Sequence, residues 1–66
     1  MRGKPQEEFI GTDGLAEITH APLGTVYRWI ADGKAPVHYR VGKRVLFRVE
    51  DVHAWLEERK VDDVRG

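Results

Sequence analysis

The chain has 66 residues, a formal net charge of zero and no cysteine. This length allows one small domain, which buries only about 60% of the surface that its unfolded chain exposes, so its stability should be marginal. Without cysteine there are no disulfides or thiolate metal sites, and no apolar run approaches the roughly 20 residues of a membrane span. The N-terminus also lacks the apolar stretch of a signal peptide, so the composition predicts a soluble cytoplasmic protein.

The charge is unevenly distributed along the chain. Residues 22–48 contain six Lys and Arg residues and one Asp, a net charge of +5, whereas residues 1–21 carry −2 and residues 49–66 carry −3. Such asymmetry is typical of a protein with one face that meets a polyanion and another that faces solvent or a second protein. The balanced total therefore does not exclude a nucleic-acid binder.

A first helix is predicted over residues 13–19, after a polar tail over residues 1–8. Thr12-Asp13 supplies a candidate cap for its start, and Leu15 and Ile18 have the spacing of a buried helical stripe. A glycine in its first turn weakens the prediction, because glycine costs about 1 kcal/mol relative to alanine in a helix.

A second helix is predicted over residues 22–31, only a few residues after the first. Pro22 suits its start, because the N–H group that proline lacks would be unpaired there. Asp32-Gly33 ends it with a glycine that can take the left-handed conformation. The apolar stripe of this helix consists of Val26, Trp29 and Ile30. Two short helices joined by so short a turn form the helix-turn-helix arrangement.

A β-hairpin is predicted over residues 37–49, where β-branched and aromatic residues alternate around a glycine. We expect a three-residue loop, Gly42-Lys43-Arg44, because the apolar residues of both strands would then share one face. A two-residue turn at Gly42-Lys43 would place arginines among them. The expected register pairs Val41 with Val45, Tyr39 with Phe47 and Val37 with Val49.

A third helix is predicted over residues 50–60, with acidic Glu50-Asp51 at its positive end. Its apolar stripe consists of Val52, Trp55 and Leu56. Residues 61–66 lack a periodic pattern and are expected to fray. The predicted fold is mainly α-helical with a β-hairpin, a winged helix-turn-helix domain over residues 9–60.

The polar face of the second helix is a candidate for contact with DNA. Arginine can donate two hydrogen bonds to a guanine edge, hydroxyl groups suit phosphate oxygens, and glycine allows close approach. A solvated face would be the commoner explanation for an isolated helix, but the preceding turn and the basic hairpin favour DNA. The candidate residues are Pro22, Gly24, Thr25, Tyr27 and Arg28.

The tip of the hairpin is basic and supplies the second group of candidates, Arg40, Lys43 and Arg44. A slender, positively charged loop can enter a narrow minor groove or follow its phosphates. The alternative is an edge strand that charge protects against aggregation. The absence of an acidic neighbour at the tip favours contact with DNA.

Other residue patterns predict no further chemistry. The large aromatic side chains suit a small core better than base stacking. The three histidines are scattered and no cysteine joins them, so neither a metal nor another cofactor is expected. The acidic pairs Glu57-Glu58 and Asp62-Asp63 have no partnering nucleophile, so the chain is not expected to be an enzyme.

Several short motifs in a fixed order resemble the excisionase-type winged-helix family, which is related to the MerR DNA-binding domains. The resemblance covers about residues 9–60. The motifs are Leu15-Ala16-Glu17-Ile18, Thr25-Val26-Tyr27-Arg28-Trp29-Ile30, Gly33-Lys34-Ala35-Pro36, Arg40-Val41-Gly42-Lys43-Arg44 and Asp51-Val52-His53-Ala54-Trp55-Leu56. Where the family usually has a Gly-Val-Ser turn, this chain has His20-Ala21-Pro22, and the entry to the first helix is altered to Gly11-Thr12-Asp13-Gly14.

Proteins of this family are recombination directionality factors of phages and mobile elements, or small regulators. The resemblance implies that the helix at 22–31 enters a major groove of double-stranded DNA and that the wing around Lys43 and Arg44 contacts an adjacent minor groove. The resemblance also implies that the chain is an excisionase. Several copies of such a protein bind neighbouring sites, bend the DNA and favour excision by an integrase. A small transcriptional repressor is the alternative, and an interaction adaptor that uses the acidic third helix is a hypothesis of a different class.

Overall fold

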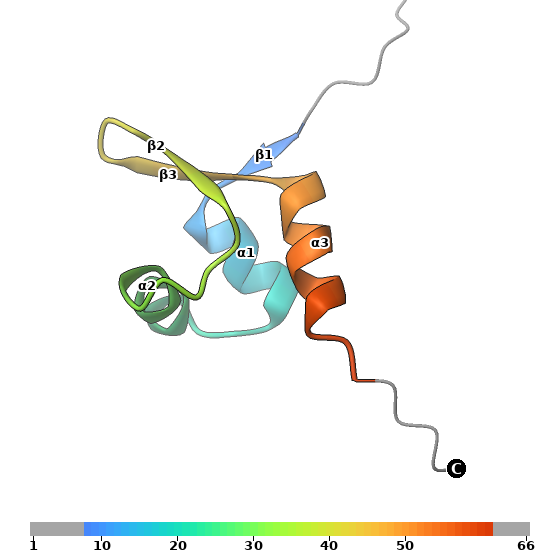
Figure 1. Cartoon of the computed structure of the whole chain (residues 1–66). Coiled ribbons are helices and arrows are strands. Elements are labelled where there is room, and N and C mark those ends of the chain that lie inside the picture. The colour runs from blue at the N-terminus through green and yellow to red at the C-terminus, as the bar shows by residue number, and fades with distance from the viewer. Residues whose placement is uncertain (1–7, 62–66) are drawn as a thin grey trace, which may run out of the picture.

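The computed structural model describes residues 8–61 of the chain. The predicted tails lie outside this range, apart from Glu8 and Val61. The elements in chain order are β1 (Phe9–Ile10), α1 (Thr12–Thr19), α2 (Leu23–Ala31), β2 (His38–Val41), β3 (Arg44–Arg48) and α3 (Val49–Glu58). Figure 1 shows the strands as one small sheet with the helices on one side of it and the β2–β3 hairpin projecting beside α2.

The first helix begins one residue earlier than predicted. Gly11 is its N-cap and no side chain caps it, so the cap expected from Thr12-Asp13 is wrong, although the Asp13 carboxylate accepts a hydrogen bond from the Gly14 N–H at 3.0 Å. Leu15 is fully buried as predicted, but Ile18 is 38% exposed. A helix of two turns has room for a narrow buried stripe only, and Ile18 lies at its edge.

The turn between α1 and α2 depends on His20. This residue has φ 58° and ψ 35°, the left-handed conformation that glycine usually supplies after a helix. The N–H of Ala21 donates to the Ala16 carbonyl at 3.0 Å and closes the end of α1. Histidine is one of the few residue types other than glycine enriched in this conformation, so the turn forms without a glycine.

The second helix agrees with the prediction to within one residue. Pro22 is its N-cap, and its carbonyl accepts hydrogen bonds from the N–H groups of Thr25 at 2.9 Å and Val26 at 3.3 Å. The helix ends at Ala31 with Asp32 as its C-cap, and Gly33 follows with φ 71°, as the Asp-Gly pair predicted.

The predicted register of the hairpin is wrong. The turn contains two residues, Gly42-Lys43, and the observed pairs are Val41 with Arg44, Arg40 with Val45, Tyr39 with Leu46 and His38 with Phe47. Gly42 has φ 61°, and a glycine with positive φ at the first central position is typical of the preferred two-residue turns.

The prediction failed because it assumed that one face of the hairpin must be wholly apolar. Arg44 lies at the exposed end of the hairpin, and Arg48 forms an ion pair with Asp51, with Nε 3.3 Å from Oδ2. The observed turn therefore buries no unpaired charge. In the observed register, Tyr39 and Val41 lie on the outer face of the sheet, where they are 44% and 55% exposed.

The sheet has a third strand that the sequence did not predict. β1 pairs antiparallel with β3, with Phe9 opposite Arg48 and Ile10 opposite Phe47. The N–H of Val49 extends this pairing by donating to the Glu8 carbonyl at 2.9 Å. A strand of two residues is too short to show any alternation of polar and apolar residues.

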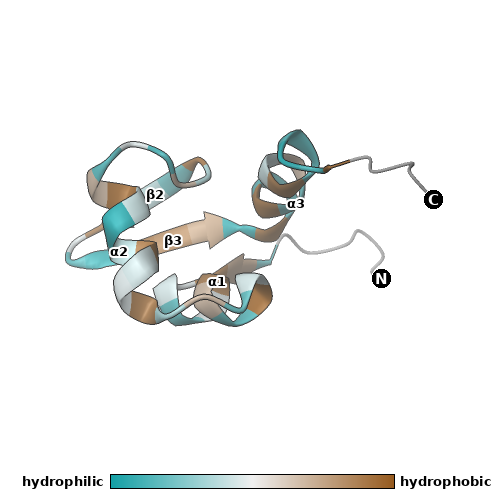
Figure 2. Cartoon of the chain, turned by 90° about the horizontal axis from the view of Figure 1, so that it is seen from below, coloured by the Kyte–Doolittle hydropathy of each residue, from teal (hydrophilic) through white to brown (hydrophobic). Residues whose placement is uncertain are grey.

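The core takes one fully buried hydrophobic residue from each of α1, α2, β3 and α3. These residues are Leu15, Val26, Phe47 and Val52, each with 0% exposure. Trp29 and Trp55 are half-buried against this cluster, as expected for core rather than base-stacking residues. Figure 2 shows the hydrophobic part of β3 in the middle of the domain with the helices around it.

Gly14 explains why α1 can lie so close to β1. A Cβ atom added at this position would meet Cβ of Ile10 at 2.8 Å, and that atom cannot move without moving the strand. We expect Gly14→Ala to destabilise the domain by about 1–3 kcal/mol, although alanine favours helices. Urea unfolding followed by circular dichroism measures this, and a stabilised variant would contradict the close contact.

These elements form the winged helix-turn-helix that the sequence predicts, since α1 and α2 are followed by a hairpin and a third helix. The third helix begins and ends within two residues of its predicted bounds and carries Glu50 and Asp51 in its first turn. None of the helices of the described chain has the length and apolar character to cross a membrane.

Candidate nucleic-acid interface

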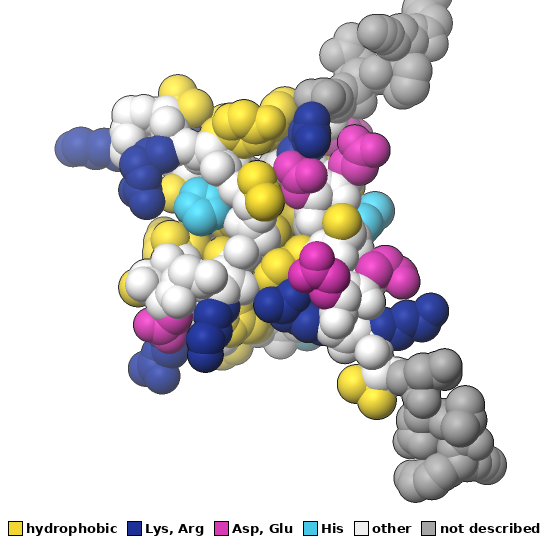
Figure 3. Space-filling model, viewed as in Figure 1, with side chains coloured by type: hydrophobic (Ala, Val, Ile, Leu, Met, Phe, Trp, Pro, Cys, Tyr) yellow, Lys and Arg dark blue, Asp and Glu magenta, His cyan; other side chains and the backbone are white. Residues whose placement is uncertain are grey.

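The hairpin tip and the region of α2 carry mainly basic side chains. Figure 3 shows Lys and Arg side chains extending there at the left, whereas most Asp and Glu side chains of this face lie at the right over α3, with further Lys and Arg side chains among them. The positive charge of residues 22–48 is thus exposed mainly on one side of this face. A face with excess positive charge attracts polyanions over a distance of about 8–10 Å at physiological salt.

The exposed face of α2 carries most of the predicted contact residues. Pro22, Gly24, Tyr27 and Arg28 are exposed, whereas Thr25 is half-buried. The opposite face contributes Val26 to the core, and this burial fixes which side of the helix points outward. The sequence analysis missed Leu23, which is 41% exposed at the first helical position and had no polar group to mark it.

Tyr27 joins the two helices of the helix-turn-helix. Its hydroxyl lies 3.4 Å from Oγ1 of Thr12, and either oxygen can donate the hydrogen bond. Thr12 was predicted only as a helix cap, because a contact between residues 15 positions apart has no signature in helical spacing. Two hydroxyl groups therefore lie together at the exposed start of α1.

A hollow of about 390 Å³ separates this hydroxyl pair from the hairpin. It brings Tyr27 of α2 to the same depression as Lys43 and Arg44, which the chain places far from it in sequence. The other lining residues are Phe9, Gly11, Thr12, Asp13, Val45 and Leu46. One predicted residue of the helix and two of the wing therefore line the same depression.

The three predicted wing cations point in different directions. Arg40 shares a face of the hairpin with Val45, Arg44 lies on the opposite face, and Lys43 is in the turn. All three are exposed. The two-residue turn therefore distributes positive charge around the tip, so that a hairpin between two walls of phosphates could contact both.

Most cations of the basic segment are unpaired within residues 8–61. Arg28, Arg40, Lys43 and Arg44 form no ion pair with another described residue. Arg48 differs, because Asp51 holds its guanidinium. The four predicted cations are thus available to an external anion. Arg48 also counts toward the charge of the basic segment, but its charge is balanced by Asp51 within the fold.

Residues 8–61 contain no group of three or more His, Cys, Asp or Glu side chains that could hold a metal ion. The side chain of His38 is engaged in the fold, with Nδ1 2.9 Å from the Pro36 carbonyl and its ring 5.4 Å from that of Phe47.

Residues 10–60 match the model of a family described as a helix-turn-helix domain. The matched span includes the helix pair, the hairpin and α3, together with every candidate contact residue. Comparison with curated proteins and with solved structures gave no significant match.

Proposed function

Because the chain belongs to this helix-turn-helix family of DNA-binding domains, we propose that it grips duplex DNA with α2 in a major groove and the β2–β3 hairpin in an adjacent minor groove. The observation that carries this proposal is the single surface on which Tyr27, Lys43 and Arg44 line one hollow. Tyr27 of α2 and two exposed, unpaired cations of the wing line that hollow, so residues of both elements face the same depression.

The residues of α2 have distinct roles in this proposal. Arg28 reads a base edge in the major groove, since a guanidinium can donate two hydrogen bonds to guanine. The hydroxyls of Thr25 and Tyr27 bind phosphate oxygens, and Pro22 and Gly24 allow the start of the helix to lie close to the backbone. In the wing, Arg40, Lys43 and Arg44 contact phosphates along the minor groove.

The salt dependence of binding tests DNA contact itself. Arg40, Lys43 and Arg44 supply three phosphate contacts, each worth a slope of about −0.9 in a plot of log affinity against log salt. Fluorescence anisotropy with a labelled duplex between 50 and 200 mM salt should give a slope near −3, and a slope about 0.9 steeper for each further cation that reaches a phosphate. Absence of duplex binding, or binding that salt does not weaken, would exclude the proposal and leave the adaptor hypothesis.

We further infer that the biological role is that of an excisionase. The resemblance of the motifs supports this role, in which several copies bind neighbouring sites, bend the DNA and assist an integrase. Footprinting on DNA that flanks the gene distinguishes this role from the alternative. Several phased sites beside a recombination core support an excisionase with cooperative binding, whereas a single site over a promoter supports a transcriptional repressor.

Arg28→Ala tests base reading by α2. We expect affinity for the specific site to fall by about 1–3 kcal/mol, and affinity for random duplex to fall less. Lys60→Ala is the matched control, because Lys60 is an exposed cation just beyond the end of α3, with Nζ 3.9 Å from Oε1 of Glu57. An equal loss on random DNA would assign Arg28 to the phosphate backbone instead.

Gly24→Ala tests close approach of α2 to DNA. A Cβ atom at this exposed position would meet nothing within 4 Å, so the fold itself does not require glycine there. We expect the variant to be more stable by about 0.5–1 kcal/mol, because alanine favours helices, and to bind DNA more weakly. Thermal melting and anisotropy measure the two effects, and unchanged DNA affinity would place Gly24 outside the interface.

A further inference from the structure

The backbone of Lys34 is bonded to two helices at once. This residue lies in the loop between α2 and β2. Its N–H donates to the carbonyl of Trp29, on α2, at 2.8 Å. Its carbonyl accepts a hydrogen bond from the indole Nε1 of Trp55, on α3, at 2.9 Å. The start of the side chain of Lys34 is therefore fixed relative to both helices, although the residue is in an exposed loop.

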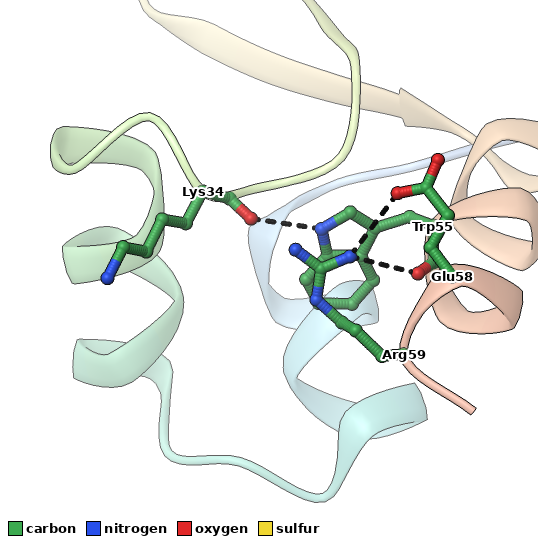
Figure 4. A network of polar contacts seen from close by, with 4 residues as sticks. All are labelled: Lys34, Trp55, Glu58 and Arg59. Atoms are coloured by element: carbon green, nitrogen blue, oxygen red, sulfur yellow. Dashed lines mark hydrogen bonds and ion pairs between the residues drawn. The ribbon is translucent and has the colours of Figure 1, made fainter. Parts of the chain in front are cut away.

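The indole that holds Lys34 is itself held in place. The ring of Trp55 packs on that of Trp29, with centroids 5.5 Å apart, and the guanidinium carbon of Arg59 lies 4.4 Å from the Trp55 centroid. NH1 of Arg59 also donates to the Trp55 carbonyl at 3.0 Å and lies 3.6 Å from Oε1 of Glu58. Figure 4 shows this network between α3 and the loop. It fixes the ring orientation that aims the indole N–H at the loop.

The side chain of Lys34 points away from this network. Figure 4 shows it running from the loop away from Trp55 and α3, toward the side on which α2 lies. Lys34 is exposed and forms no ion pair with the part of the chain that the structure describes. Its ammonium group thus adds to the positive charge of the α2 side.

We propose that Lys34 is a further contact to the DNA phosphate backbone and that Trp55 is the positioning residue that holds it there. The proposal rests on the proposed DNA binding. A flexible lysine loses conformational entropy when it binds a phosphate, and a fixed backbone reduces that loss. The acidic helix α3 thereby contributes to DNA binding without touching DNA.

The test uses two pairs of matched variants. Lys34→Gln removes the charge, and Lys60→Gln removes the same charge from the segment that follows α3. Trp55→Phe removes the indole N–H and keeps an aromatic ring, whereas Trp29→Phe makes the same change in the partner ring, whose N–H has no hydrogen bond within residues 8–61. Anisotropy is measured against salt well below the melting temperature of each variant, so that every protein is folded.

Lys34→Gln should make the salt slope shallower by about 0.9, so that affinity falls about threefold less than in the parent between 50 and 200 mM salt. Trp55→Phe should shift the slope in the same direction, and it should have no further effect when combined with Lys34→Gln. Lys60→Gln should keep the parent slope, and Trp29→Phe, which leaves an aromatic ring against Trp55 and the Trp55 indole N–H in place, should change the slope less than Trp55→Phe does. Rings that only stabilise the fold would change the melting temperature without changing the slope.

Each contrary result has a separate meaning. A parent slope near zero contradicts the proposed function itself. A steep parent slope that Lys34→Gln leaves unchanged overturns the Lys34 contact alone. If Lys34→Gln reduces the slope, two results would still overturn the positioning role of Trp55. In the first, Trp55→Phe reduces the slope further when it is combined with Lys34→Gln. In the second, Trp55→Phe changes the slope no more than Trp29→Phe does.

Discussion

Phe47→Ala is expected to unfold the domain. Phe47 is fully buried in β3, where it faces Ile10 across the sheet and joins the core cluster with Leu15 and Val26. Truncation of a core phenylalanine costs about 3–5 kcal/mol, which is a large part of the stability of a domain of this size. Far-ultraviolet circular dichroism at 25 °C should show loss of helix, and urea unfolding measures what stability remains.

Tyr39→Ala is the matched comparison, because it also tests the register of the hairpin. In the observed register Tyr39 lies on the outer face of the sheet, 44% exposed, with its ring 5.7 Å from that of Phe9. We therefore expect Tyr39→Ala to lower the free energy of unfolding by less than half as much as Phe47→Ala does. In the three-residue-loop register Tyr39 would face the core beside Phe47, so equal losses in the two variants would contradict the observed pairing.

Replacing both Lys43 and Arg44 by alanine is expected to remove the wing from the DNA complex. Two lost phosphate contacts make the salt slope shallower by about 2, and the affinity at low salt should fall more than for Arg28→Ala on random DNA. The fold should remain intact, because both side chains are exposed and form no ion pair with a described residue. Anisotropy across a salt series measures the slope, and thermal melting checks the fold.

Competition with a minor-groove ligand adds a second measurement for the wing. Netropsin should displace the parent protein from an A·T-rich duplex more effectively than it displaces the double variant, because only the parent keeps the wing cations that we propose to lie in that groove. Lys60→Ala serves again as the cation control. A double variant with the parent slope and the parent response to netropsin would leave α2 as the sole contact with DNA.

The helices and the composition of the core could be predicted from the sequence because their signals are local. Periodic apolar residues, a proline at the start of α2 and a glycine after its end each act within a few residues of one another. Val26 and Val52 are buried as their stripes predicted. The limits of this reasoning appear at Ile18, which has the right spacing but lies beyond what the small core can cover.

The register of the hairpin could not be predicted in the same way. The choice between two loop lengths depended on whether arginine next to the turn would be buried, and that depends on how far the hairpin extends beyond the helices. Arg44 is exposed because the tip projects from the domain, and Arg48 is neutralised by Asp51 on the next helix. Both facts belong to the assembled domain, so a local pattern of polar and apolar residues could not decide them.

The amino-acid sequence alone determined which residues form helices, which cations lie in the basic segment and which fold class results, since each depends on neighbours in the chain. Tertiary structure decided the rest: the pairing of Gly42-Lys43 as a two-residue turn, the approach of Tyr27 to Thr12, and the bond from Trp55 to Lys34. These contacts join residues from different elements, and packing of those elements around Phe47 sets their distances. The predicted surface for DNA thus came from local sequence, and its geometry came from the core beneath it.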